Sequence, residues 1–150
     1  MDRWTDGGVS SGRGEPIYDH IVNNGLTDDF RKMLGEIAGI DARFGVMDIP
    51  GTSGVFVQKF RNKQLAFGGI ASTGTAVFAL FYYWYRHLDG VRFLYVDEFD
   101  SYYHYEMSEK IVRLVSDMEG FQTVSTTHNV ALLSDSLLRP DRCLVLKVGG

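Results

Sequence analysis

Two short stretches of the sequence place side chains capable of acid–base and metal chemistry directly after apolar segments. The apolar run 93–96 leads straight into Asp97 and Glu98, and a later apolar run ends in Ser-Thr-Thr-His, which contributes the imidazole of His128. Paired carboxylates attract hard, oxygen-seeking cations such as Mg²⁺, and a carboxylate can also take a proton from water. These residue types predict chemistry on a phosphate that is bound together with magnesium.

A third stretch, Ile-Ala-Ser-Thr-Gly-Thr at 70–75, is suited to binding phosphate. It is a loop of small residues that opens onto the apolar segment 75–87, which is too long for one strand and predicts a buried helix. The hydroxyls of Ser72, Thr73 and Thr75, with the free N–H groups at the positive end of that helix, would contact phosphate oxygens. The purely structural alternative is that the same residues only cap the helix.

The acids and the histidine depend on the order of elements in the C-terminal half. We expect strands at 91–96, 121–126 and 143–148, and helices at 103–118 and 130–138. This β-α-β-α-β order indicates parallel strands with right-handed crossovers, and the first strand, apolar on both faces, is expected in the sheet interior. Ligands collect where such strands end, so the acids and the histidine should be neighbours. In that partly buried place the carboxylates would need a compensating cation.

The N-terminal half has a different character. Residues 1–16 are rich in Gly, Ser and charge and are expected to form a flexible segment, whereas 17–69 should hold a helix and a small antiparallel sheet. The helix is expected to be capped by Thr27 and to stop at Gly39. The three strands of the antiparallel sheet are expected at 44–49, 55–60 and 64–67.

Composition limits the classes of function. The chain has 150 residues, 45% of them hydrophobic, and a net charge of -4, so it predicts about one globular domain without the basic field of a nucleic-acid binder. A single cysteine, Cys143, excludes an internal disulfide and fits a reducing compartment. No apolar run is long enough to span a bilayer, so we expect a cytoplasmic protein with no membrane partner.

The ordered set IASTGT, long helix, FLYVDEFDS, helix and VSTTH resembles the second half of an ABC-type ATPase domain, especially the SMC, RecF and OLD-like group, over about residues 64–148. The STGT spelling resembles the form used by this non-transporter group. The resemblance implies nucleotide contacts from a signature motif and a D-loop at Ser72, Thr73, Gly74, Thr75, Asp100 and Ser101. It further implies a Walker B magnesium residue at Asp97, a catalytic base at Glu98 and a switch histidine at His128.

A Walker A motif, which the resemblance requires, is not recognisable. Residues 7–14 have its two-glycine spacing, but Arg13 stands where lysine belongs and Gly14 where a hydroxyl belongs. No apolar strand leads into that stretch, and no glutamine loop follows it. We therefore expect a C-terminal portion, a split form or a degenerate form of an ATPase, completed by a second ATPase domain as a homodimer or with a Walker A-bearing partner.

These features predict an α/β fold with a P-loop NTPase-like parallel sheet and flanking helices over 70–150, forming an incomplete domain after the helical and antiparallel extension. The predicted function is a share in an ATP-binding, ATP-hydrolysing ABC-type ATPase, with ATP as substrate and Mg²⁺ as cofactor. The family resemblance suggests DNA repair or phage defence, with any nucleic acid reached through the complete protein.

Three other functions fit parts of the sequence. The letters DEFD at 97–100, followed by Ser-Thr-Thr at 125–127, echo a DExD-type helicase, although no arginine-rich final motif follows. A Toprim-like nuclease would share the acids but needs an upstream strand that presents a glutamate. A non-catalytic interaction module would keep the fold and bind a partner through aromatic side chains, namely Tyr82, Tyr83, Trp84, Tyr102, Tyr103 and Tyr105.

Overall fold

The computed structural model describes residues 16–51, 54–134 and 136–146, which form two compact units, Met1–Asp89 and Gly90–Gly150. The predicted flexible segment and the Walker A-like glycines fall almost entirely outside the described residues. Both units mix helices and strands, so the α/β class is confirmed, and the fold is compatible with a partial P-loop-like domain. None of the helices in the described part is long and apolar enough to cross a lipid bilayer.

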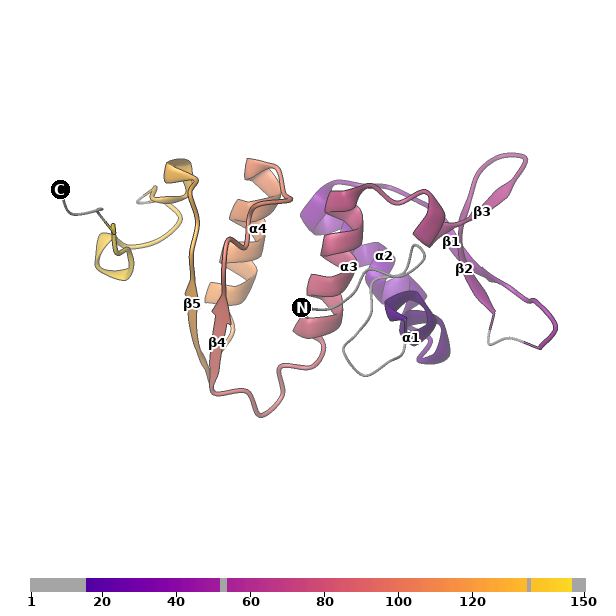
Figure 1. Ribbon diagram of the computed structural model, residues 1–150, viewed down its shortest axis with the longest axis horizontal. Coiled ribbons are helices and arrows are strands. Elements are labelled where there is room, and N and C mark those ends of the chain that lie inside the picture. The colour runs from indigo at the N-terminus through magenta and orange to yellow at the C-terminus, as the bar shows by residue number, and fades with distance from the viewer. Residues whose placement is uncertain (1–15, 52–53, 135, 147–150) are drawn as a thin grey trace. The chain divides into compact units, whose positions relative to one another are not determined.

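The described part of the first unit contains three α-helices (Figure 1): α1 at Ile17–Asn23, α2 at Thr27–Ala38 and α3 at Thr73–Tyr85. Helix α2 carries two aspartates in its first turn, which suits the helix dipole, and it ends at Gly39 in the left-handed conformation, with a φ of 68°, as expected. Thr27 is its first residue and not its cap, which is a correction to the sequence interpretation.

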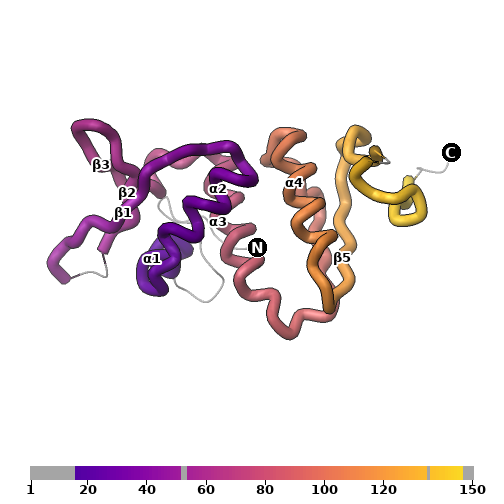
Figure 2. Tube along the Cα trace, turned by 180° about the vertical axis from the view of Figure 1, so that it is seen from behind, coloured from indigo at the N-terminus to yellow at the C-terminus, as the bar shows by residue number. Residues whose placement is uncertain are grey.

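The antiparallel sheet of the first unit is confirmed with slightly shorter strands. It runs β1-β2-β3, from Phe44–Met47 through Val55–Lys59 to Gln64–Ala66, and Val46 lies opposite Phe56. Figure 2 shows the same hairpins from behind. A short 3₁₀ turn, η1, at Phe67–Gly69 then leads toward α3.

An aromatic core joins the helices of this unit to its sheet. Phe30 on α2 is fully buried, and its ring lies within 5.2 to 6.2 Å, centroid to centroid, of five other rings. Those rings belong to Phe44, Phe56, Phe67, Phe78 and Tyr82. Because α3 contributes two of them, the loop before α3 is held in place by this core.

Two tyrosines of the first unit, Tyr18 and Tyr82, are buried and have raised pKa values. Burial raises the pKa of Tyr18 to about 12, and its hydroxyl has no hydrogen-bond partner within the described residues. Burial, together with the hydrogen bond that its hydroxyl donates to Asp29 at 2.6 Å, also raises the pKa of Tyr82. In both cases the folded state favours the neutral phenol.

We expect the free energy of unfolding of this unit to keep its highest value below about pH 10. It should fall as the pH rises toward the folded pKa of Tyr18. The unfolded chain releases these phenolic protons first, so alkali favours unfolding, and the shift of Tyr18 corresponds to about 3 kcal/mol. Urea unfolding followed by tryptophan fluorescence measures this, because Trp84 lies on α3 of this unit. Tyr18→Phe should flatten part of the pH dependence, whereas a wild-type profile flat above pH ~10 would contradict the prediction.

The second unit contains the predicted parallel strands. Strand β4 at Phe93–Val96 pairs in parallel with β5 at Gln122–Ser125, and Val96 lies opposite Ser125. Helix α4 at Tyr105–Ser116 connects the strands and lies beside them in both views (Figures 1 and 2). The helix places Ile111 inward, at 4% exposure, as its apolar stripe predicts.

Three expectations for this unit were wrong. Strand β4 is not an interior strand, since Phe93 and Tyr95 are 57% and 56% exposed. Of the short helical piece expected over 130–138, the described residues contain only the 3₁₀ turn η2 at Val130–Leu132, and another 3₁₀ turn, η3, follows at Pro140–Arg142. Residues 143–146 form no strand, and the rest of that expected strand lies outside the described residues.

Candidate functional site

The ends of the two parallel strands bring the acids and the histidine together. Asp97 and Glu98 follow β4 directly, and His128 lies three residues beyond the end of β5. Nε2 of His128 lies 3.1 Å from Oε1 of Glu98, and because a carboxylate only accepts, the imidazole N–H is the donor. Three residues that the sequence singled out are therefore neighbours.

Asp97 is held by two hydroxyl groups. The hydroxyl of Tyr95 donates to Oδ1 of Asp97 at 3.2 Å, and Oγ1 of Thr126 donates to the same oxygen. The negative charge of Asp97 raises the pKa of Tyr95 above its usual value. Both of these hydrogen bonds end on Oδ1 of Asp97.

Glu98 has a separate set of contacts. Besides His128, its carboxylate accepts a hydrogen bond at Oε2 from Oγ of Ser101, at 3.3 Å. Its backbone N–H donates to Oγ1 of Thr126 at 2.8 Å. Glu98 also has a φ of 45°, a left-handed conformation that no other non-glycine residue adopts in the part of the chain described. Such conformations persist only where their surroundings hold them, and they cluster at functional sites.

The site is more exposed than the sequence interpretation assumed. The side chains of His128 and Glu98 are 89% and 55% exposed, and Asp97 is also exposed. The argument that partial burial forces a cation onto these carboxylates is therefore corrected, since water can solvate them here. What remains is geometry: two carboxylates with different donors, and an imidazole beside one of them.

Asp100 and Ser101 form the turn after Glu98. The N–H of Ser101 donates to the backbone oxygen of Glu98 at 3.0 Å, and the N–H of Tyr103 donates to that of Asp100 at the same distance. Ser101 thus touches the predicted base, while Asp100, half-buried, forms no ion pair with any described residue. Their predicted nucleotide contacts remain predictions.

The loop at 70–75 belongs to the first unit and forms a helix cap. Oγ of Ser72 accepts a hydrogen bond from the N–H of Thr75 at 3.2 Å and lies 2.8 Å from Oγ1 of Thr75. Thr75 is 9% exposed, so its hydroxyl serves the cap, whereas Ser72 and Thr73 are exposed. The N–H groups of Thr73 and Gly74 lie in the first turn of α3, where helices present donors to anions.

Tyr95 was not singled out from the sequence, and Thr126, although expected at the end of the second parallel strand, was given no role there. Tyr95 lies two residues before Asp97, which puts both on the same side of a strand, and this spacing could have indicated the contact. Thr126 follows Ser125 just as Asp97 follows Val96, so the strand register places the two side by side. That register is known only once the strands are seen to pair.

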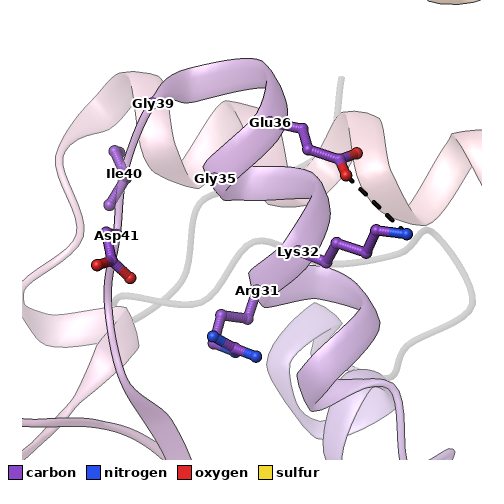
Figure 3. A pocket seen from close by; sticks show the side chains of 7 residues that line it. All are labelled: Arg31, Lys32, Gly35, Glu36, Gly39, Ile40 and Asp41. Atoms are coloured by element: carbon purple, nitrogen blue, oxygen red, sulfur yellow. Dashed lines mark ion pairs between the residues drawn. The ribbon is translucent and has the colours of Figure 1, made fainter.

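The described surface also has a shallow hollow of 330 Å³ in the first unit (Figure 3). It lies along the second half of α2, where Nζ of Lys32 is 3.9 Å from Oε1 of Glu36. Its other lining residues are Arg31, Gly35, Gly39, Ile40 and Asp41. None of these was predicted to take part in chemistry, and the hollow is not formed by the acids at the strand ends.

Comparison with protein families identifies the chain. A family model described as "AAA domain, putative AbiEii toxin, Type IV TA system" matches residues 22–134, which is most of the sequence. The chain belongs to this family of AAA domains. The resemblance to an AAA-annotated, ABC-type ATPase domain is thereby confirmed. Comparisons with curated proteins and with solved structures gave no match.

The extent of the AAA-domain match adds to the sequence interpretation. It begins at residue 22, well before the resemblance seen from about residue 64, and it ends at 134. Helix α2 and the antiparallel sheet therefore lie within the matched part of the AAA domain. Membership supports a P-loop ATPase-like domain with nucleotide binding as its general capacity.

Proposed function

We propose that this AAA domain supplies the hydrolytic groups of an ATPase site. The observation that carries the proposal is the contact between Glu98 and His128, at 3.1 Å, beside Asp97 where two parallel strands end. Family membership adds the substrate class, since ATPase activity is what an AAA domain suggests. In this proposal Asp97 is the magnesium residue, Glu98 the general base and His128 the contact to the terminal phosphate.

The residues fit a magnesium ion that arrives with the nucleotide. Mg²⁺ is usually held by one or two carboxylates together with substrate phosphates and water. Asp97 offers one such carboxylate, and the described residues contain no group of three His, Cys, Asp or Glu side chains that could hold an ion. When bound, Mg²⁺ neutralises charge on the phosphate oxygens.

The remaining chemistry falls to Glu98 and His128. Glu98 orients a water molecule and takes its proton as the water oxygen bonds to the terminal phosphorus. The bond from that phosphorus to the bridging oxygen breaks, and ADP leaves with the bonding electrons. His128 donates from its imidazole N–H, so it can turn from the Glu98 carboxylate to a phosphate oxygen.

The cap at the start of α3, in the first unit, has a separate role in the proposal. Ser72, Thr73 and Gly74 present an exposed hydroxyl pair and first-turn N–H groups, while Thr75 supports the loop from within. The family resemblance implies that such a loop covers a nucleotide held by another ATPase domain. The partner we propose is therefore a second ATPase domain that carries a Walker A motif, either in a homodimer or in a different chain.

A reconstitution experiment tests the proposal. The chain is mixed with a full-length relative that carries a Walker A motif and whose own Walker B glutamate is replaced by glutamine, and phosphate release is followed with ATP and Mg²⁺. We call this mixture the reconstituted enzyme. Hydrolysis that appears only when the chain is added supports the proposal. Stable complex formation without hydrolysis would refute it and favour the non-catalytic interaction module.

The interaction-module alternative has lost part of its support. Tyr82 and Tyr83 are 1% and 6% exposed, so they belong to the core and cannot bind a partner. Trp84 and Tyr102, at 52% and 62% exposure, remain available on the surface. A role in DNA repair or phage defence remains a proposal about the complete protein, for which the family's description as a toxin of a toxin–antitoxin system offers a setting.

A further inference from the structure

One hydroxyl group connects both acids of the candidate site. Oγ1 of Thr126 accepts the hydrogen bond from the N–H of Glu98, at 2.8 Å, and donates its own proton to Oδ1 of Asp97. A hydroxyl has a single proton to donate, and Thr126 donates it to Asp97, while a lone pair of the same oxygen accepts the N–H of Glu98. Thr126 therefore contacts two consecutive residues through one atom.

The backbone of Thr126 is itself fixed on both sides. Its N–H donates to the backbone oxygen of Val96 at 3.0 Å, and its own backbone oxygen accepts from the N–H of Phe99 at 3.3 Å. These bonds continue the β4–β5 pairing past the end of the strands. Because a β-branched side chain has few rotamers, a fixed backbone also fixes the direction of the hydroxyl.

The conformation of Glu98 explains why such a contact is needed. If the strand continued past Val96, the side chains of Asp97 and Glu98 would point to opposite faces, yet both residues contact groups from the loop after β5, Thr126 and His128. They lie in the turn after β4, where the left-handed φ of 45° at Glu98 ends the alternation. This conformation is unfavourable for a glutamate, and the bond from its N–H to Thr126 holds it in place.

We propose that Thr126 is the positioning residue of this site, holding the carboxylate of Asp97 and the left-handed backbone of Glu98 in a fixed mutual arrangement. The inference rests on the proposed function for its consequence in catalysis. Its structural half, that the Thr126 hydroxyl maintains the backbone of Glu98, can be tested in this chain alone.

The structural test compares Thr126→Val, which keeps the shape and removes the hydroxyl, with Thr126→Ser, which keeps the hydroxyl. Amide hydrogen exchange is measured by NMR on the full chain. In Thr126→Val we expect exchange of the Glu98 N–H to accelerate about three- to tenfold, and in Thr126→Ser to stay near wild type. The amides of residue 126 and of Phe99 bond to backbone oxygens and serve as internal controls for intact strand pairing.

The outcomes separate clearly. Unchanged protection of Glu98 in Thr126→Val would overturn the proposal. If the control amides also lose protection, the pairing itself has opened, and Thr126→Ala, which removes the same hydroxyl with less bulk, decides the question by the same comparison. Acceleration at Glu98 with protected controls in either variant, reversed in Thr126→Ser, supports the proposal.

The catalytic test uses the reconstituted enzyme. Thr126→Val should lower kcat at least about tenfold with KM for ATP nearly unchanged, because it misplaces the acids without removing a binding group, and Thr126→Ser should recover most of the loss. Glu98→Gln is measured in parallel. If Glu98→Gln has no effect, the proposed function fails, whereas a strong Glu98→Gln effect with a silent Thr126→Val refutes only the role of Thr126.

Discussion

Replacing Glu98 by glutamine should lower ATP turnover in the reconstituted enzyme by at least ~10², because glutamine keeps the shape of the side chain but cannot take a proton from water. Nucleotide affinity should change little, since neither the magnesium residue Asp97 nor the cap before α3 is altered. Single-turnover phosphate release measures the chemical step, and equilibrium titration with ATP and Mg²⁺ measures binding separately.

A matched control for this change exists in the same unit. Glu119 is exposed and lies just before β5, whose other end leads to His128, so Glu119→Gln makes the same chemical change away from the site. It should leave turnover unchanged. Equal loss of turnover in both variants would indicate a general charge effect, and full activity of Glu98→Gln would remove Glu98 from the role of base.

The second large effect concerns the core that positions the cap before α3. Phe30→Ala should lower the free energy of unfolding of the first unit by about 3–5 kcal/mol, because it removes a fully buried ring in contact distance of five others and leaves a cavity. Urea unfolding followed by tryptophan fluorescence reports on this unit, because Trp84 lies on α3.

Phe60→Ala is the control for the core prediction. Phe60 follows β2 and is 41% exposed, so the same truncation there should cost less than about 1 kcal/mol. A similar loss in both variants would show that the ring cluster around Phe30 is not what stabilises the unit. Loss of the core should also reduce hydrolysis by the reconstituted enzyme, because α3 carries the cap.

The sequence was informative where local chemistry decides structure. The two aspartates and the terminal glycine correctly predicted the start and the end of α2. The long apolar run correctly predicted α3, which begins slightly earlier, at Thr73. Alternation and turn residues located the antiparallel strands to within about two residues. Helix α1, which begins at Ile17 after Pro16, was missed because its seven residues are too few for a clear periodic pattern.

Where structure depends on distant partners, the sequence misled. Phe93 and Tyr95 suggested an interior strand, but apolar character does not reveal how many strands lie alongside, and β4 has one neighbour among the described residues. The expected third strand failed for the same reason, as its β-branched and apolar residues give propensity without a pairing partner.

In the candidate site, too, some features could be predicted from the sequence and others could not. Parallel pairing was predictable from the order of elements, and with it the meeting of Glu98 and His128. The left-handed backbone of Glu98 and the double contact of Thr126 were not, because they depend on register and torsion angles that no residue type encodes alone. Burial of Tyr82 and Tyr83 agrees with the buried helix that the apolar run 75–87 predicted.

The most direct test of the site replaces Mg²⁺ by paramagnetic Mn²⁺ in the reconstituted enzyme with ATP and follows the amide NMR signals of this chain. The proposal predicts that signals of Asp97, Glu98 and His128 broaden first, and that Asp97→Asn prevents it while Asp117→Asn does not. Sharp signals at these three residues, with broadening elsewhere in the chain, would contradict the assignment of the metal-bound triphosphate to the ends of β4 and β5.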